Sequence, residues 1–111
     1  MYSTSIATAV VFRKWRDTGT VIALFPELPS DLYGNFCDSY ETIGQHGGAD
    51  YHGVMAQTSP ASPSEYESLA IELERIDYNL RPVRRASQAM HDRRREEARA
   101  YRLATASLER P

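Results

Sequence analysis

Two histidines and an aspartate lie within seven residues in the middle of this 111-residue chain: His46, Asp50 and His52. Imidazole nitrogens and carboxylate oxygens bind zinc and related divalent ions. Three such ligands with an open fourth position would form a catalytic metal site, so one hypothesis is a metal-dependent enzyme. The spacing fits no metal motif that we can justify, and no fourth ligand is evident. The alternative is a polar glycine loop that carries two surface histidines, and no cofactor is then expected.

The single cysteine, Cys37, is the second candidate for chemistry. A thiolate nucleophile needs a nearby base, which His46 or His52 could supply. The neighbouring acids Asp38 and Glu41 would raise the pKa of the thiol and so oppose its activation. We therefore expect a buried, unreactive cysteine. One cysteine also cannot form an intrachain disulfide, which favours a reducing, cytoplasmic location.

Charge is separated along the chain, although the formal net charge is only −2. Residues 17–74 contain ten acids and neither lysine nor arginine, whereas residues 81–111 contain nine arginines and four acids. Such asymmetry predicts a charged partner. The alternative is that the two parts attract each other within one fold, because surface charge often serves solubility alone.

The leading functional hypothesis is a small, non-enzymatic binding or regulatory protein. It would act through charged surfaces on a protein partner or on a second copy of itself. Six arginines form the predicted partner-binding site: Arg84, Arg85, Arg93, Arg94, Arg95 and Arg99. We expect that losing the cluster at 93–95 weakens partner binding without unfolding the protein. Another possibility is that the acidic stretch imitates nucleic acid and docks into a basic groove of a second protein.

Nucleic-acid binding through the arginine-rich C-terminal residues is the alternative function, because arginine contacts phosphates well. The acidic body, with a sequence pI near 5.9, would repel the same phosphates. Aromatic residues between 33 and 51 could stack on bases, but acids surround them in the sequence. Residues 44–48 (GQHGG) have the glycine content of a phosphate loop, but they lack its lysine and do not lead directly into a helix.

Strands should position the first half of these residues. The expected strands are residues 8–15, 20–25, 34–43 and 51–58. Residues 17–19 supply a turn, and 44–48 form a glycine loop. The second run is apolar on both faces, which is typical of a central strand that Pro26 and Pro29 would end. The four strands predict an antiparallel meander.

Helices should position the second half. Residues 62–65 (SPSE) form a capping box with proline at the first helical position, which predicts a helix start. Apolar residues at helical spacing continue this helix to 76, and 77–79 provide its exit. Residues 80–85 are predicted as a short edge strand. The arginine-rich residues 87–108 form a helix so polar that it is either exposed to solvent or covered by a partner, and it can project from the domain.

These elements predict one α+β domain over residues 1–111. It has a mainly antiparallel sheet of four or five strands and two helices in the C-terminal half, in the order strand-strand-strand-strand-helix-strand-helix. The first helix is expected to pack on one face of the sheet. The predicted core comprises Val10, Phe12, Val21, Ile22, Leu24, Val54, Leu69, Leu73 and Ile76.

Composition excludes several other classes. The chain is 41% hydrophobic and 25% charged, close to globular averages, which argues against a disordered, collagen-like or disulfide-rich protein. No apolar run approaches the roughly 20 residues of a membrane span. The N-terminal residues also lack the basic, apolar and small segments of a signal peptide in their usual order. We therefore expect no membrane partner.

Four short segments carry a resemblance to known proteins. They are residues 43–51 (IGQHGGADY), 58–66 (TSPASPSEY), 78–80 (YNL) and 90–95 (MHDRRR). In these segments the chain resembles short bacterial proteins of unknown function that occur in phages and integrated mobile elements. The resemblance implies a small bacterial cytosolic protein that acts on a host or defence component. It carries no established activity and assigns no role to any residue.

Overall fold

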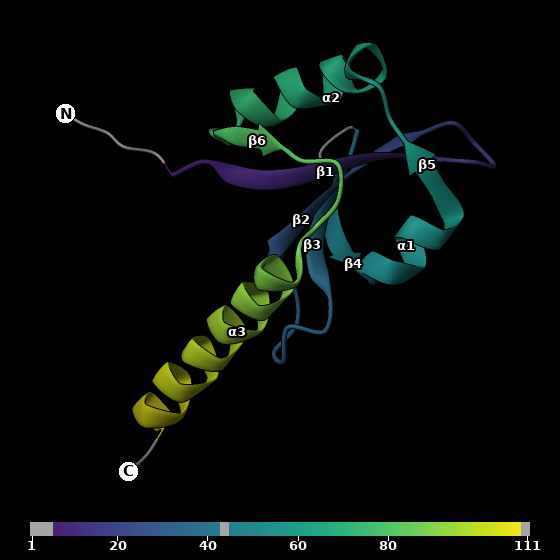
Figure 1. The fold of residues 1–111 in the computed structure, drawn as a ribbon. Helices are drawn as coiled ribbons and strands as arrows, with labels where there is room; N and C mark the ends of the chain where they lie inside the picture. The colour runs from purple at the N-terminus through teal and green to yellow at the C-terminus, as the bar shows by residue number, and fades with distance from the viewer. Residues whose placement is uncertain (1–5, 43–44, 110–111) are drawn as a thin grey trace.

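The computed structural model describes residues 6–42 and 45–109, and the fold is α+β (Figure 1). In these residues six strands form one sheet: β1 (Thr8–Trp15), β2 (Val21–Pro29), β3 (Cys37–Glu41), β4 (Gln45–Ala49), β5 (Thr58–Pro60) and β6 (Leu80–Pro82). Three helices accompany the sheet: α1 (Tyr51–Gln57), α2 (Pro63–Arg75) and α3 (Gln88–Glu109). The predicted fold class is confirmed, and α1 is an additional helix.

The sheet is a meander with two short strands on one outer edge. Its order is β4-β3-β2-β1-β5. β1, β2 and β3 each pair antiparallel with the next strand in sequence, which agrees with the predicted meander, but the fourth strand is β4 and not residues 51–58. β5 pairs antiparallel with the C-terminal half of β1, and β6 pairs parallel with its N-terminal half. β6 is therefore an edge strand, in agreement with the prediction from Pro82.

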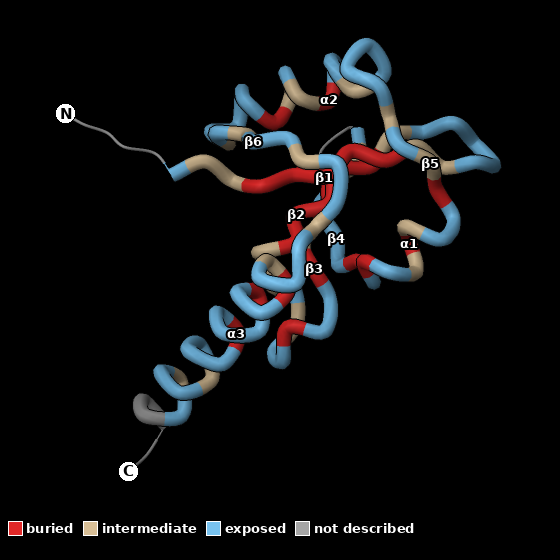
Figure 2. The backbone as a smooth tube through the Cα atoms, viewed as in Figure 1, coloured by how far each residue is buried: buried red, intermediate tan, exposed pale blue. Residues whose placement is uncertain are grey.

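β1 and β2 are buried on both faces, because helices cover both sides of the sheet (Figure 2). The core toward α2 contains Val10, Phe12, Ala23, Phe25, Tyr40, Leu69 and Leu73. The core toward α1 contains Val11, Ile22, Leu24, Cys37, Ala49, Tyr51 and Val54. Burial on both faces explains why these two strands are continuous apolar runs in the sequence.

Most of the predicted core is confirmed. The buried members are Val10, Phe12, Ile22, Leu24, Val54, Leu69 and Leu73. Val21 is only partly buried. The prediction for Ile76 is wrong, because this residue is 46% exposed. Ile76 follows the last residue of α2, and Asp77 turns the chain there with a φ of 77°, so Ile76 lies beyond the buried stripe of the helix.

Residues 51–57 form a helix, so the prediction of a strand over 51–58 is wrong for this stretch. Tyr51 and Val54 are three residues apart and therefore face the same core from one side of the helix. Arg13 and Arg16 donate to carbonyl oxygens of the last helical turn at 3.3 and 2.8 Å. They satisfy groups that a helix end leaves unpaired. These donors come from β1 and the residue after it, so no local sequence pattern could reveal them.

The edge strand β4 occupies residues for which the sequence predicted a glycine loop, and this is a second correction. The glycines do not form a turn; they allow a neighbouring segment of the chain to pack closely against β4. A Cβ atom on Gly48 would lie 2.6 Å from Ser30 Oγ. Ser39 Oγ also donates to the carbonyl of Gly47 at 3.0 Å and strengthens the pairing.

The sequence predicts that Pro26 and Pro29 end this strand; β2 continues past Pro26 and ends at Pro29, so the prediction is wrong for Pro26 alone. A register shift between Phe25 and Pro29 lets the strand pass Pro26, and pairing with β3 resumes at Pro29 opposite Cys37. β3 starts at Cys37 and not at residue 34, because the preceding residues form a loop beneath α3.

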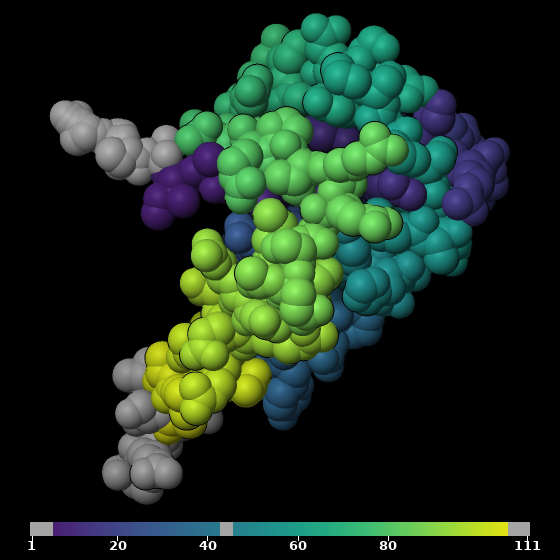
Figure 3. Space-filling model, in the orientation of Figure 1, coloured from purple at the N-terminus to yellow at the C-terminus, as the bar shows by residue number. Residues whose placement is uncertain are grey.

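The capping box of α2 is confirmed, since the carboxylate of Glu65 accepts a hydrogen bond from the N–H of Ser62 at 2.8 Å. α3 has 22 residues and is therefore about 33 Å long. Its C-terminal half projects from the body of the molecule at the lower left of Figure 3. In the described ranges no helix is long and apolar enough to cross a bilayer.

Candidate functional site

A buried arginine anchors the N-terminal half of α3. Arg94 is 2% exposed, and its guanidinium donates to the carbonyls of Pro26 and Gly34 and to Nδ1 of His91, each at 2.8 Å. Because these groups surround Arg94 inside the protein, it is not available to a partner. This corrects the predicted partner-binding site, which included Arg94. Replacing all three arginines at 93–95 would disturb the packing of α3 as well as its surface.

The loop before β3 meets α3 at close range through Gly34. This residue has a φ of +74°, and a Cβ atom on it would lie 3.0 Å from Cα of Arg95 and 3.2 Å from Cβ of Ala98. Asp31 closes the loop by accepting a hydrogen bond from the N–H of Phe36 at 2.8 Å. The conformation of the loop and the absence of a side chain at Gly34 therefore allow α3 to pack closely on β2.

The other five predicted arginines are exposed: Arg84, Arg85, Arg93, Arg95 and Arg99. They do not form one surface. At about 100° per residue, Arg95 and Arg99 lie about 40° apart around α3, whereas Arg93 lies about 160° from Arg95. Arg93 instead pairs with Glu27, at 3.5 Å between Nη1 and Oε2. We call Arg95 and Arg99 the basic face of α3.

Attraction between the two charged parts of the chain is limited within the fold. In the part of the chain that the structure describes, the pair of Arg93 with Glu27 is the one ion pair that joins residues 17–74 to residues 81–109. Arg99 pairs only within α3, at 3.5 Å from Glu96, and these two side chains are 61% and 71% exposed. The basic face is therefore not neutralised by the acidic stretch.

Arg102 is a further surface residue that the sequence interpretation missed. Its Nη1 donates to the carbonyl of Leu32 at 2.8 Å, and its guanidinium lies 4.7 Å from the centroid of the Tyr33 ring. Arg94, Ala98 and Arg102 are spaced four residues apart and so lie along one side of the helix. That spacing was the signal in the sequence that could have assigned Arg102 to the loop contact.

Exposed apolar side chains border the C-terminal half of α3. The large ones are Leu32, Tyr33, Tyr101 and Leu103. A groove of about 400 Å³ runs between the loop and the helix, with Leu32, Ala98 and Tyr101 among its lining residues. The helix thus presents both charge and apolar surface to its surroundings.

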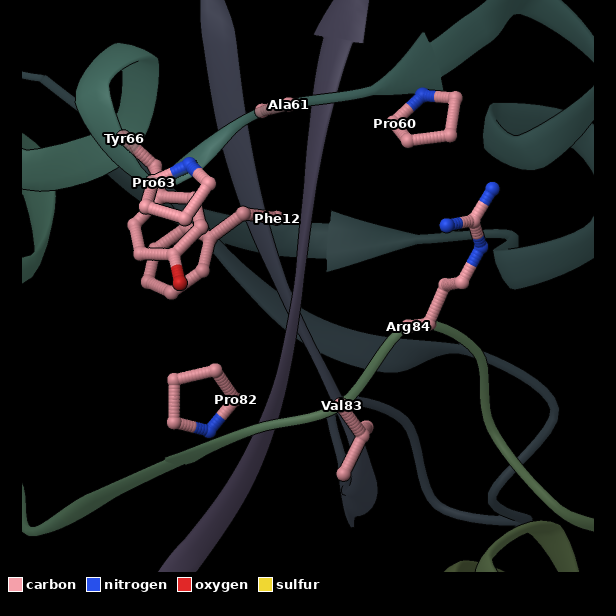
Figure 4. A pocket seen from close by; sticks show the side chains of 8 residues that line it. All are labelled: Phe12, Pro60, Ala61, Pro63, Tyr66, Pro82, Val83 and Arg84. Atoms are coloured by element: carbon pink, nitrogen blue, oxygen red, sulfur yellow. The ribbon is translucent and has the colours of Figure 1, made fainter.

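Arg84 lies at an apolar pocket of about 240 Å³ (Figure 4). Phe12 and Tyr66 stack at its wall, with ring centroids 4.0 Å apart. Three prolines complete much of the lining: Pro60, Pro63 and Pro82. Figure 4 shows the guanidinium of Arg84 on the side of Pro60, away from the stacked rings.

Arg85, the next residue, lines a different pocket of about 290 Å³ together with His52 and His91. The two imidazole centroids are 5.2 Å apart. His91 is 5% exposed, and burial, followed by the charge of Arg94, lowers its pKa. The sequence interpretation missed His91, because no spacing pattern relates residues 52 and 91. Only the docking of α3 beside α1 brings them together.

The structure does not assemble the predicted metal site. The imidazole of His46 lies on the α2 side of the sheet, where Nε2 is 3.3 Å from the hydroxyl of Tyr78. Asp50 is the N-cap of α1, and His52 lies in α1 on the opposite face. Across residues 6–42 and 45–109, no group of three His, Cys, Asp or Glu side chains could hold a metal ion. A metal-dependent reaction through these three residues therefore has no support.

Cys37 lies fully buried in the core toward α1. Burial raises the pKa of its thiol to about 11, although the nearby charge of Arg94 acts in the opposite direction. A neutral, enclosed thiol agrees with the expected unreactive cysteine.

Among known proteins, no family, no curated protein and no solved structure matches this chain. The resemblance to short bacterial proteins of phages and mobile elements therefore stays a prediction.

Proposed function

We propose that this protein is a non-enzymatic binding protein whose α3 docks onto an acidic surface of a partner protein. One observation carries the proposal: the basic face of α3, Arg95 and Arg99, is exposed and not neutralised by the acidic stretch of the same chain. Arg99 has only the exposed Glu96 of the same helix as its ion-pair partner, and exposed charge of this kind accelerates and orients association with a complementary surface.

The surroundings of the basic face support a protein partner. Leu103 is 59% exposed and lies about 40° from Arg99 around the helix. Arginine is enriched at protein interfaces, where an apolar contact is bordered by polar groups. The phosphates of a nucleic acid would contact the arginines, but a nucleic acid would bury the exposed leucine less favourably than a protein would.

The anchoring of α3 also supports the proposal. Arg94 and Gly34 fix the base of the helix on the sheet. A helix that is already ordered loses little conformational entropy when a partner binds. The partner would therefore meet a preformed surface.

The test compares two variants that each remove two positive charges. R95Q/R99Q removes the basic face, whereas R81Q/R93Q removes exposed arginines elsewhere and is the matched control. Each variant is used to capture protein from nuclease-treated host extract, and the affinity for the purified partner is then measured by calorimetry. We expect R95Q/R99Q to bind about 10-fold more weakly, from two partly screened charge contacts, and the control to bind within about twofold of the parent.

Equal binding by R95Q/R99Q and the parent protein would contradict this assignment of the binding face. Sedimentation of the protein alone distinguishes a second copy of this chain from a different protein as the partner. A second copy would show a concentration-dependent dimer that R95Q/R99Q weakens.

Nucleic-acid binding through the same helix is the second candidate. The observation that favours it is that Arg84, Arg85, Arg95 and Arg99 are all exposed along α3 and the segment before it. Four phosphate contacts would give a slope of about −3.6 in log affinity against log salt on duplex DNA. Captured material that nuclease removes, with such a slope, would replace the protein partner by nucleic acid.

A bacterial, cytoplasmic location belongs to the same proposal. The free, buried Cys37 suits a reducing compartment. The resemblance noted above points to bacterial phages and mobile elements as the source.

A further inference from the structure

A pocket of about 290 Å³ lies where α1, the segment before α3 and the first turns of α3 meet. Its lining residues include Tyr51, His52, Met55, Arg85, Gln88 and His91. None of the residues that line it is acidic. The volume is at the lower end of the range for small-molecule sites and is ample for a small anion.

His91 presents a fixed hydrogen-bond donor to this pocket. Its Nδ1 is 2.8 Å from Nη1 of Arg94, and a guanidinium can only donate, so Nδ1 accepts and the ring proton is on Nε2. Nε2 has no hydrogen-bond partner among the described residues. Since every fully buried side-chain N or O atom in those residues has a partner, Nε2 must reach accessible space, and His91 is one of the residues that line this pocket.

The donor is held in an environment that favours a neutral imidazole. His91 is 5% exposed, and its ring packs against Tyr51 at 4.8 Å and His52 at 5.2 Å between centroids. Burial, then the charge of Arg94, lowers the pKa of His91, so it stays neutral near pH 7. A neutral imidazole with its proton on Nε2 cannot accept a proton there, so this group is a binding donor and not a general base.

The lining of the pocket also supplies positive charge. The exposed Arg85 supplies a full charge, and Gln88 is the first residue of α3, whose N-terminus favours anions. The hydroxyl of Tyr51 accepts the N–H of Ala86 at 2.7 Å and has no acceptor for its own proton among the described residues. Asp92, next to His91 in the sequence, accepts a hydrogen bond from the Gln88 side chain at 3.0 Å, and its charge acts on the pKa of His91 in the opposite direction to that of Arg94.

We propose that this pocket binds a phosphate group, with Arg85 as the charge partner and the Nε2–H of His91 as an inner donor. The site goes beyond the docking of α3 to a protein, because it uses neither Arg95 nor Arg99. Free phosphate, a nucleotide and a phosphorylated peptide share this chemistry. The pocket requires only the tetrahedral dianion or monoanion itself.

Arg84 and Arg85 provide a matched pair for the test. Both are exposed and adjacent in sequence, but Arg84 lies at the apolar pocket of Figure 4 and Arg85 lines the pocket of His91. Inorganic phosphate is titrated into the full chain and into R84Q and R85Q. Binding is followed by calorimetry and by the NMR signals of the His52 and His91 rings. We expect saturable shifts of both rings, an affinity at least 10-fold weaker in R85Q, and an affinity within twofold of the parent in R84Q.

The proposal is overturned if phosphate leaves both imidazole signals unmoved at millimolar concentration, or if R84Q and R85Q weaken binding equally. H52Q provides a second variant at an exposed position. If phosphate shifts the His91 signal as in the parent and binds H52Q and R85Q with unchanged affinity, the proposal is also overturned. Adenosine 5′-monophosphate and a phosphoserine peptide are titrated in parallel. Tighter binding of either one supports the pocket and identifies the source of the phosphate.

Discussion

Two arginines are buried among the described residues, and both bond to neutral groups. Arg13 is 8% exposed and donates to Oγ1 and to the carbonyl of Thr58 at 2.9 and 2.8 Å. Arg94 is buried in the same way against two carbonyls and a histidine. Burial lowers the pKa of both groups, yet arginine remains charged in proteins. Several charge-assisted hydrogen bonds compensate each buried charge in place of an acid.

Replacement of Arg94 tests this role. In R94M the carbonyls of Pro26 and Gly34 lose their donor while the apolar volume is largely kept. We expect the free energy of unfolding to fall by about 3 kcal/mol, because buried carbonyls are left unpaired. Urea denaturation followed by circular dichroism measures the change.

The neighbouring variant R95M is the control for Arg94, since Arg95 is exposed on the same helix. We expect it to change the unfolding free energy by less than about 0.5 kcal/mol. Equal effects of R94M and R95M would show that the bonds of Arg94 contribute little to stability.

At the scale of the element, α3 depends on a loop that is far from it in sequence. The helix has little apolar surface of its own, and it is held by Arg94 and Arg102 and by the approach of Gly34. A polar helix of this kind needs such specific contacts, because burial of its small apolar surface alone would not fix the direction of the helix. The loop therefore positions α3 along the side that carries Arg94 and Arg102, and the basic face is left exposed.

Two contributions of Gly34 to stability can be measured separately: its positive φ and its close approach to α3. Gly19 and Gly34 both have positive φ, but a Cβ atom would meet nothing within 4 Å at Gly19 and would crowd α3 at Gly34. We expect G19A to cost about 1 kcal/mol, from the backbone alone, and G34A to cost about 3 kcal/mol. Thermal denaturation gives both values.

Hydrogen exchange locates the effect of G34A, since amides in the first turns of α3 should exchange faster while those of β1 remain protected. If G34A and G19A have the same cost and the same exchange pattern, the loop does not seat the helix.

At the scale of the whole molecule, the separation of charge along the chain is not resolved by contact within the fold. Among the described residues a single ion pair joins the acidic stretch to the C-terminal arginines, and it is largely exposed on the arginine side at 67%. Exposed pairs contribute between about 0 and 1 kcal/mol to stability. The charged parts should therefore matter for association more than for folding.

Salt provides the corresponding test. Raising sodium chloride from about 0.05 M to about 0.5 M screens surface charge strongly. We expect the melting temperature to change by less than about 4 °C, because salt removes little attraction between the acidic and the arginine-rich parts of the same chain. A fall of more than about 8 °C would show instead that the two parts hold each other together, and the basic face would then be part of the fold. The measurement is scanning calorimetry of the protein at fixed concentration.

The sequence by itself determined the features that arise between near neighbours. Residues 8–15 match β1, the apolar run of β2 indicated a central strand, and the capping box placed the start of α2. The polar character of residues 87–108 predicted the exposed α3. These signals depend on side-chain type and spacing within a few residues, which the sequence shows directly.

Only the tertiary structure decided the rest. The carbonyls at the end of α1 are bonded by donors 40 and 42 residues away, and β4 pairs with β3 along an edge where Gly48 lies close to Ser30. Arg94 is buried by a carbonyl 60 residues away, although it lies between two exposed arginines. His91 joins His52 only when α3 docks. Contacts across such separations are set by packing of the whole chain, so residue type and local spacing do not reveal them.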